Sequence, residues 1–525
     1  MNNVYILDCT LRDGGYCNQW NFEYSNIKKI ISCLIESNVE IVECGFLTDS
    51  INYERDKSKF TDLSQLEDII PENRENKLFV LMVNYGDYDL NSLPVYDGKT
   101  IDGIRIAFHK NDVAGAIEDC KIIKNKGYKV FVQPMVSLSY SDEDFLKLIK
   151  KVNDFEPYAF YIVDSFGMMK SKDLTRLFYM IEHNLNEKVL IGFHSHNNMQ
   201  LAYSNAQTLV SLRTNRNLII DCSIYGMGRG AGNLNTELFI DFLNDNYCKR
   251  YKLKPILTII DDVLNMFYQR KYWGYSLPNY ISASYNAHPN YAIYLDAKRT
   301  LTVEDMDNIF QLMSDERKVE FDKEYIEELY IKYMERDSIN CTNLAQLKER
   351  IKGRDILIIA PGKSSYDEKN KIVSFIENKE VITISINFDY PIFKTDYIFL
   401  SNLRRYRELD PENRKRCIVT SNISSMDVYV QIKYKDLINK YEAVEDNAGM
   451  MLVKFLILYE ARKIYIAGLD GYSADITNNF GDDRMNFYTE KTNLEAMNIG
   501  MNLALKEFSN DIQIEFLTAQ KKVRI

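Results

Sequence analysis

Short apolar runs rich in β-branched side chains recur through the first 225 residues. Eight of them stand out: VYIL (4–7), VEIVECGF (39–46), LFVLMV (around 79–83), GIRIAF (103–108), KVFVQPMV (129–136), AFYIVDS (159–165), VLIGFH (189–194) and LIIDCSIYG (218–226). Runs of this length and composition predict buried β-strands.

Segments with apolar residues at helical spacing separate most of these runs, for example SNIKKIISCLIES (25–37) and DEDFLKLIKKVNDF (142–155). Apolar strands that alternate with amphipathic helices indicate a parallel sheet buried on both faces. Eight such units in about 225 residues predict a (β/α)₈ TIM barrel, within the α/β class. A doubly wound open sheet is the alternative.

The pattern changes after residue 240, where tyrosine-rich helical segments follow one another. A new series of strands and helices starts with ILIIAPGKSS, which ends at residue 365. We therefore predict a barrel at residues 1–240, a helical extension of the barrel at 241–350, and a smaller Rossmann-like α/β domain at 351–525.

Composition narrows the class of protein. The chain has 525 residues, a net charge of −10 and 46% hydrophobic residues, with no apolar run near the roughly 20 residues that cross a bilayer. Neither a membrane span nor a broad nucleic-acid surface is expected. Nine cysteines without a CxxC pair, and an N-terminus unlike a signal peptide, favour a cytoplasmic protein. Whether it forms a homo-oligomer is left open.

Candidate metal ligands follow two of the predicted strands. Asp13 lies in DCTLRDGG (8–15), after the first strand, and His194 and His196 lie in HSHNN at the end of the seventh. The loops after barrel strands converge on one face of the barrel. Two imidazoles and a carboxylate can hold a divalent cation and leave positions open for substrate. The alternative is that the histidines only cap the strand.

Three motifs together, DCTLRDGG, HSHNN and GMGRGAGNLNTE (226–237), resemble the superfamily of 4-hydroxy-2-oxovalerate aldolase, HMG-CoA lyase and isopropylmalate synthase. The resemblance is closest to the aldolase branch. It implies that Asp13, His194 and His196 bind Mn²⁺ or Mg²⁺, with Asn233 near the metal.

The implied substrates are a 2-keto acid and an aldehyde. Cleavage between C3 and C4 of a 4-hydroxy-2-keto acid leaves a pyruvate enolate, whose charge needs a Lewis acid and a nearby cation. The resemblance assigns stabilisation of the enolate oxygen to Arg12. Gly14 and Gly15 would let this turn approach the reacting group.

Several further residues are candidates for catalysis or substrate binding. The aldolases usually carry a base histidine three residues after the position of Asp13, where this chain has Tyr16, so the general base is left open. The other candidates are Glu43 after the second strand, His109 after the fourth, Asp164 and Ser165 after the sixth, and Tyr285 and His288 in the helical part. For each of these, a structural role is the alternative.

The third part resembles the nucleotide-sugar-binding fold of bacterial sialyltransferases, in ILIIAPGKSS, ISINFDYPIFKTDYIFLSN (384–402) and NAGMMLVKFLILYEARKIYIAGLDGY (447–472). This resemblance implies a nucleotide or nucleotide-sugar cleft. Loop amides at Gly362 and Ser364 could cradle a phosphate, although an ordinary turn explains them equally well. Candidate cleft residues are Gly362, Ser364, Asn387, Ser401, Asn402, Asn447, Gly449 and Asp470.

Three functions remain open from the sequence. The first is a metal-dependent aldolase or lyase fused to a nucleotide- or sugar-binding module, a combination that suits surface-polysaccharide precursor metabolism. The second is an acyltransferase of the same superfamily that condenses an acyl-CoA with a 2-keto acid. The third is a non-catalytic binding protein that retains a metal, because the base histidine is missing.

Overall fold

A computed structural model describes residues 4–298, 300–335, 343–423, 425, 427–487, 489 and 491–524 of the chain. The chain divides into two compact units. The first comprises Met1–Ile293 and Ser314–Phe321, and the second comprises Tyr294–Met313 and Asp322–Ile525. The helical segments between residues 241 and 350 are therefore shared between the two units.

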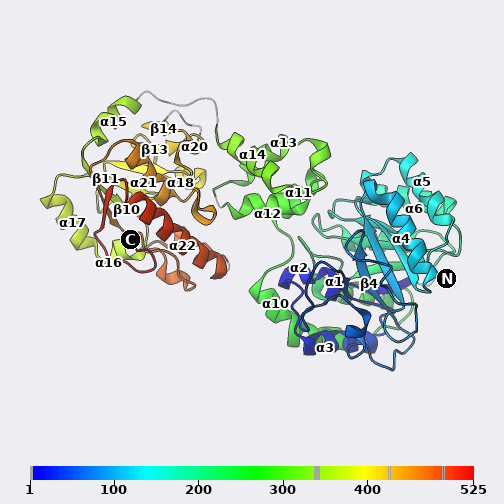
Figure 1. Cartoon of the computed structure of the whole chain (residues 1–525). Helices are drawn as coiled ribbons and strands as arrows, with labels where there is room; N and C mark the ends of the chain where they lie inside the picture. Colours follow the sequence, from blue (N-terminus) through cyan, green and yellow to red (C-terminus); the bar gives the residue numbers. More distant parts are fainter. Residues whose placement is uncertain are drawn as a thin grey trace. The chain divides into compact units, whose positions relative to one another are not determined.

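The first unit contains a closed barrel of eight parallel strands (Figure 1). They are β1 (Val4–Asp8), β2 (Ile41–Leu47), β4 (Leu78–Asn84), β5 (Gly103–Phe108), β6 (Lys129–Pro134), β7 (Ala159–Asp164), β8 (Leu190–Ser195) and β9 (Leu218–Cys222). Neighbours run in the order β1-β9-β8-β7-β6-β5-β4-β2, and β1 also pairs with β2, which closes the barrel. A short strand, β3 (Lys59–Phe60), pairs with Phe46 and Leu47 at the carboxyl end of β2. The predicted TIM barrel is confirmed.

Helices between the strands bury their apolar faces against the barrel. The longer ones are α3 (Tyr24–Glu36), α4 (Val113–Asn125), α5 (Asp142–Asn153), α6 (Ser171–Asn184), α7 (Ala202–Ser211) and α8 (Thr236–Asn246). In α3, the apolar spacing that predicts a helix places Ile27, Ile30, Ile31 and Leu34 in the core. In α5, the hydroxyl of Ser141 caps the first turn by accepting from the Asp144 amide.

Further helices complete the chain between the barrel and the second sheet. These are α9 (Leu253–Ile259), α10 (Asn265–Arg270), α11 (Leu277–Ser284) and α12 (Pro289–Ala297), followed by α13 (Val303–Gln311), α14 (Lys323–Met334) and α15 (Leu344–Ile351). A π-helical turn, Ile260–Leu264, joins α9 to α10.

The second unit contains a seven-stranded parallel sheet in the order β14-β13-β12-β11-β10-β15-β16. The strands are β10 (Asp355–Ile359), β11 (Ile382–Ile386), β12 (Tyr397–Leu400), β13 (Cys417–Thr420), β14 (Val430–Ile432), β15 (Lys463–Ala467) and β16 (Gln513–Phe516). The chain moves outward from β10 in one direction through β14 and then returns to the other side of β10. This arrangement confirms a second α/β domain of doubly wound type.

The helices of this unit follow its strands. They are α16 (Lys363–Asp367), α17 (Lys369–Asn378), α18 (Leu403–Glu408), α19 (Pro411–Arg414), α20 (Tyr434–Leu437), α21 (Ala448–Leu458) and α22 (Lys491–Phe508). No helix in the described part of the chain has the length and apolar character needed to span a membrane.

Candidate metal centre and active site

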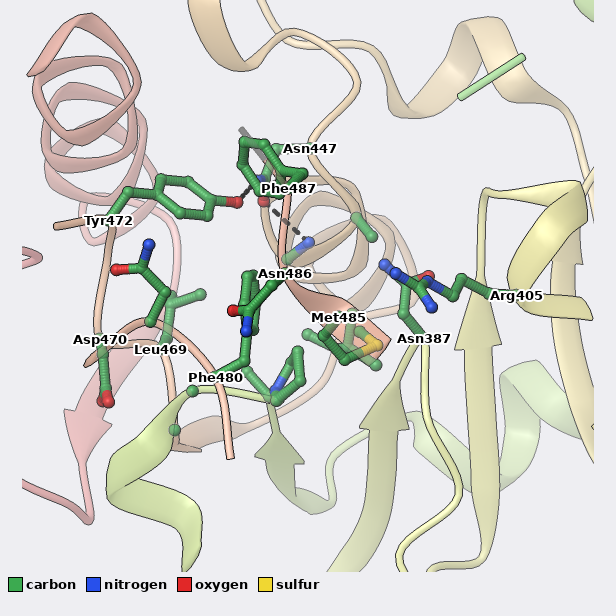
Figure 2. Close-up of a pocket in the computed structure, with 18 of the residues that line it drawn as sticks. Asn387, Arg405, Asn447, Leu469, Asp470, Tyr472, Phe480, Met485, Asn486 and Phe487 are labelled. Carbon is green, nitrogen blue, oxygen red and sulfur yellow. Dashed lines mark hydrogen bonds between the residues drawn. The ribbon is translucent and has the colours of Figure 1, made fainter. Parts of the chain in front are cut away.

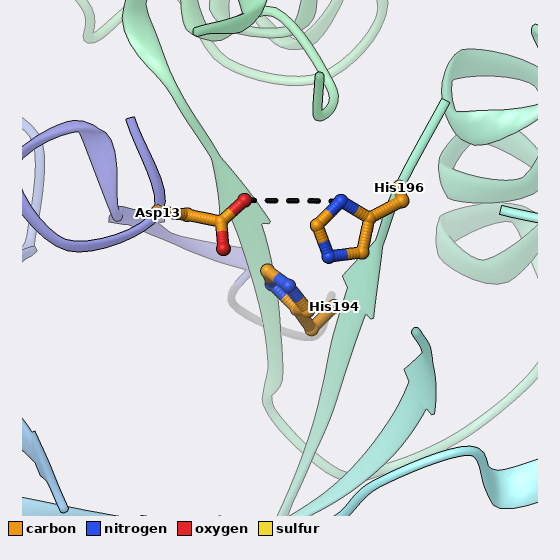
Figure 3. A group of neighbouring side chains, drawn as sticks. All are labelled: Asp13, His194 and His196. Atoms are coloured by element: carbon orange, nitrogen blue, oxygen red, sulfur yellow. Dashed lines mark ion pairs between the residues drawn. The ribbon is translucent and has the colours of Figure 1, made fainter. Parts of the chain in front are cut away.

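Three buried side chains meet at one end of the barrel (Figure 3). Asp13 ends α1 (Thr10–Asp13), the short helix after β1, whereas His194 belongs to β8 and His196 follows it. One ligand atom from each residue lies within 4.8 Å of the other two. Oδ2 of Asp13 is 3.8 Å from Nδ1 of His196. The structure thus brings together the three residues that the sequence predicts as metal ligands.

Glycines make room for this arrangement. A Cβ atom on Gly14 would lie 2.3 Å from the carbonyl oxygen of Thr10, and one on Gly15 would lie 2.1 Å from the Trp20 ring. A Cβ on Gly228 would lie 2.8 Å from Oδ2 of Asp13. The glycines of DCTLRDGG and GMGRGAGN therefore permit close backbone approach at the metal-binding end of the barrel.

A chain of buried charges connects the two sides of the triad. Arg12 contacts Asp13 through Nη1 at 2.6 Å and Glu43 through Nε at 3.0 Å. Glu43 also accepts from Nη1 of Arg105 at 2.7 Å. Each residue in this chain is at least 90% buried, so the pairs lie in a medium where charge interactions are strong.

The same series of buried charges continues to His194. Arg105 forms an ion pair with Asp221, and Oδ2 of Asp221 lies 3.0 Å from Nδ1 of His194. Burial opposes ionisation of Asp221, but Arg105 and His194 lower the pKa of its carboxyl below the ordinary value. An ionised carboxylate only accepts hydrogen bonds, so Nδ1 of His194 donates to Asp221 and Nε2 is the ring nitrogen available to a metal.

Asp13 and His196 have shifted pKa values that favour the ligand form of each side chain. Burial alone would raise the pKa of Asp13, but Arg12 and the two histidines lower it below its ordinary value. Burial lowers the pKa of His196 to about 3 against the opposing effect of Asp13. Asp13 is therefore an anion and His196 is neutral, as metal ligation requires.

Unsatisfied polar atoms at this position fit a divalent cation. Nδ1 of His196 and Oδ1 of Asn233 are buried and have no hydrogen-bond partner among the described residues. Nδ2 of Asn233 lies 2.6 Å from Oδ2 of Asp13, which places the predicted fourth residue beside the triad. Buried polar atoms of a native protein are normally satisfied, and a cation with its ligands would satisfy these.

Arg12 keeps one donor for another group. Its Nε and Nη1 contact Glu43 and Asp13, whereas Nη2 is buried and meets no hydrogen-bond acceptor within the residues that the structure describes. An unpaired guanidinium N–H beside the triad can stabilise negative charge on a bound substrate.

The other predicted catalytic residues lie at the rim or behind it. The Tyr16 ring is 36% exposed and lies 5.5 Å from the guanidinium carbon of Arg229. Nη1 of Arg229 is 3.5 Å from Nε2 of His288, and burial lowers the pKa of His288 to about 3. Nδ1 of His288 accepts from the Asn290 amide, so this nitrogen is engaged within its own turn.

Glu43 is linked to Asp13 through Arg12 and to His194 through Arg105 and Asp221, and Tyr285 faces Lys318 at the end of α11. His109 precedes the short 3₁₀ helix Lys110–Asp112, where it contributes to the low pKa of His288. These residues are therefore placed to support the site rather than to contact a substrate at its centre.

Asp164 and Ser165 support neighbouring loops. Burial raises the pKa of Asp164 to about 7, although its carboxylate accepts from the Met168 amide at 3.0 Å and from the Met169 amide at 3.1 Å. The Ser165 hydroxyl accepts from the Val136 amide, and its carbonyl accepts from Arg229. The geometry favours the structural role that the sequence leaves as an alternative.

Six of the eight cleft residues predicted in the second unit line one cavity: Gly362, Asn387, Asn402, Asn447, Gly449 and Asp470. Of the other two, Ser364 donates both its amide and its hydroxyl to Asp470, and the carbonyl of Ser401 accepts from Asn422. The start of α16 therefore already has a carboxylate where the sequence suggests a phosphate cradle.

Comparison with known proteins supports the barrel assignment. Residues 103–263 match the family described as HMGL-like. A 4-hydroxy-2-oxovalerate aldolase of Geobacillus genomosp. 3 is 27% identical over 245 residues, covering 46% of this chain and 70% of the relative. The enzyme of the same name from Pelotomaculum thermopropionicum is 27% identical over 270 residues, covering 50% and 77%.

A solved structure shows the same fold. The carboxyl transferase domain of Rhizobium etli pyruvate carboxylase with 3-bromopyruvate superposes with a TM-score of 0.50 at 14% identity, over 67% of this chain and 65% of that one. The family match lies within residues 103–263, so it lends no support to the sialyltransferase resemblance of residues 354–480. The comparisons support the HMGL-like superfamily, whose members include lyases and condensing enzymes, for the barrel of this chain.

Proposed function

We propose that the barrel is a divalent-metal-dependent carbon–carbon lyase that cleaves or forms the C3–C4 bond of a 4-hydroxy-2-keto acid through a pyruvate enolate. The observation that carries the proposal is the buried group of Asp13, His194 and His196 beside the unpaired Nη2 of Arg12. The similarity to 4-hydroxy-2-oxovalerate aldolases supports the same reaction class.

Asp13, His194 and His196 would hold the cation, with Asn233 beside them. Mn²⁺ and Mg²⁺ suit the carboxylate and amide oxygens of this set. A cation at this position supplies Lewis acidity for the carboxylate and keto oxygens of the 2-keto acid.

Arg12 stabilises the enolate oxygen in this proposal. Its guanidinium is fixed by Asp13 and Glu43, so Nη2 needs no reorganisation when negative charge develops on the substrate. Glu43 is in turn fixed by Arg105, which makes Arg12 part of a preorganised array rather than a mobile surface side chain.

Tyr16 is our candidate for moving the proton of the 4-hydroxyl group. It follows the metal-binding turn and lies at the mouth of the barrel, with its ring 5.5 Å from the guanidinium carbon of Arg229. His288 is less suited, because its Nδ1 accepts from a backbone amide and its Nε2 faces the Arg229 guanidinium.

The direct test is release of pyruvate from a series of 4-hydroxy-2-keto acids, followed by coupled reduction with lactate dehydrogenase. We expect release that requires added Mn²⁺ or Mg²⁺ and is lost in Asp13→Ala. Thiol release from an acyl-CoA in the presence of a 2-keto acid, without pyruvate release from any 4-hydroxy-2-keto acid, would instead identify a condensing acyltransferase. If the metal-loaded, folded protein shows neither activity, a non-catalytic role is favoured.

The surface-polysaccharide role stays a prediction, since it depends on what the second unit binds.

A further inference from the structure

A cavity of about 420 Å³ lies at the carboxyl ends of β10, β11, β12 and β15 in the second unit (Figure 2). β10 lies between β11 and β15. The chain runs from β10 to β11 on one side and later returns to β15 on the other side. In open parallel sheets, ligands bind outside the carboxyl ends of the strands at this kind of switch point. The volume lies within the usual range of about 300–1,000 Å³ for small-molecule sites.

The floor of the cavity is rigidly built. A Cβ on Gly362 would lie 2.1 Å from the Gly468 carbonyl oxygen, and one on Gly468 would lie 2.2 Å from the Ala360 carbonyl oxygen. Asp470 binds Ser364 and also pairs with Lys521 at 3.2 Å. Two strand ends are thus held in close contact, and the Asp470 charge is already compensated within the protein.

One side of the cavity presents aromatic rings. The ring centroid of Phe487 lies 5.4 Å from that of Tyr472, and the Phe480 centroid lies 6.2 Å from each of the other two. All three side chains are half-buried. Oδ1 of the neighbouring Asn486 is buried and has no partner in the described part of the chain. Aromatic faces with an open amide acceptor suit a planar ring that carries N–H donors.

The other side presents cations and a second open acceptor. Figure 2 shows Arg405 and Asn387 on the side of the cavity away from Tyr472. Nη1 of Arg405 contacts Glu408 at 3.0 Å, which leaves its other N–H groups for a ligand. Oδ1 of Asn387 is buried and, within the described residues, has no hydrogen-bond partner.

Arg404 and Arg484 also line the cavity. Arg484 pairs with Asp482 through Nε and Nη2, so its Nη1 is the nitrogen that can turn to a ligand beside Arg405. Arg405 and Arg484 are shared with an adjoining cavity of about 170 Å³. An anionic group at these arginines is therefore reachable from both spaces, and guanidinium groups bind phosphate through paired N–H donors.

We propose that this cavity binds a nucleoside phosphate. The base lies against Tyr472, Phe480 and Phe487, with its N–H groups directed to Asn486. The phosphate lies at Arg405 and Arg484, and a ribose hydroxyl donates to Asn387. Base, sugar and phosphate thus account for the aromatic wall, the unsatisfied amide oxygens and the arginines together. The site goes beyond the proposed function of the barrel and does not depend on it.

Calorimetric titration of the full-length protein tests the proposal with AMP, GMP, CMP and UMP, the corresponding nucleosides and inorganic phosphate. We expect at least one nucleotide to bind with a Kd below about 1 mM, and its nucleoside and inorganic phosphate to bind at least about tenfold more weakly. Absence of nucleotide binding at several millimolar would overturn the proposal. Equal binding of inorganic phosphate would also overturn it.

Variants locate the site. Arg405→Gln should weaken nucleotide binding by about tenfold or more, because a charge-assisted contact to phosphate is lost. Arg407→Gln is the matched control, since Arg407 lies on the same helix, pairs with Glu304 and is not part of the cavity wall. Phe487→Leu should weaken nucleotide and nucleoside binding alike.

Equal effects of Arg405→Gln and Arg407→Gln would show that the phosphate does not bind in this cavity. Unchanged binding in Phe487→Leu would show that the base does not bind against the aromatic wall. Asp13→Ala should bind the nucleotide normally, so failure of the barrel chemistry and failure of this site give different results.

Discussion

Nδ1 of His194 lies 3.0 Å from Oδ2 of Asp221, and Arg105 pairs with the same carboxylate. His194 lies one residue before the end of β8, whereas Asp221 belongs to β9, the next strand of the barrel. The contact fixes the orientation of a predicted metal ligand from inside the barrel and engages its Nδ1. A side chain that does not reach the metal can therefore control how well the metal is held.

Asp221→Asn should weaken binding of Mn²⁺ by about 10- to 100-fold while the barrel stays folded. An amide can turn its NH₂ group toward the imidazole, which favours the wrong tautomer of His194. Metal affinity measured by calorimetry on the metal-free protein checks this, with the exposed Asp142→Asn as the control. Equal affinity in all three proteins would show that Asp221 does not position the ligand.

Arg105→Met should destabilise the barrel by about 3–5 kcal/mol, because Glu43 and Asp221 would lose a shared buried partner. Both tryptophans, Trp20 and Trp273, belong to the first unit, so denaturant unfolding followed by their fluorescence reports this unit selectively. The surface substitution Arg176→Met should change the free energy of unfolding by no more than about 1 kcal/mol. Similar small losses in both variants would contradict the assigned role of the charge chain.

Arg12→Lys should retain the metal but slow the exchange of pyruvate methyl protons by about 10²-fold or more. A lysine ammonium cannot contact Glu43, Asp13 and a substrate oxygen with the fixed geometry of a guanidinium. Elemental analysis establishes metal content, and proton NMR in heavy water measures the exchange. Wild-type exchange in a metal-loaded variant would exclude Arg12 from enolate stabilisation.

Tyr16→Phe should separate two steps of the reaction. Pyruvate exchange needs no 4-hydroxyl group, so we expect it to stay within about threefold of the wild type, whereas cleavage of a 4-hydroxy-2-keto acid falls by about 10²-fold or more. His288→Gln is the comparison variant. Cleavage that survives in Tyr16→Phe and is lost in His288→Gln would transfer the proton-moving role to His288.

The barrel was predictable because its strands are continuous apolar runs separated by amphipathic helices. The triad was predictable because Asp13, His194 and His196 lie in short motifs at strand ends. The roles of Arg105 and Asp221 were not predicted. Each is a charged residue inside an apolar run, GIRIAF or LIIDC, and this could have signalled a buried pair. Their partnership spans 116 residues and depends on barrel closure, which no local pattern specifies.

The second unit shows the same limit. Its strands could be read from the sequence, and most of the predicted cleft residues do line one cavity. The role suggested for Ser364 could not be judged locally, because Asp470, 106 residues away, occupies its amide and hydroxyl. Arg404 and Arg405 of α18 and the aromatic residues after β15 line the same cavity because of the order of the strands in the sheet. No local sequence pattern specifies that order.

In our proposal, Asp13, His194 and His196 hold a cation that activates a 2-keto acid. The rate at which pyruvate methyl protons exchange with heavy water, followed by proton NMR, tests this directly. We expect exchange by the wild-type protein with Mn²⁺ or Mg²⁺, its loss after chelation, and its recovery when metal is restored. We also expect no exchange above background in His194→Ala. Exchange that is equally fast after chelation or in folded His194→Ala would contradict the proposal, as would no exchange by the fully metal-loaded wild type.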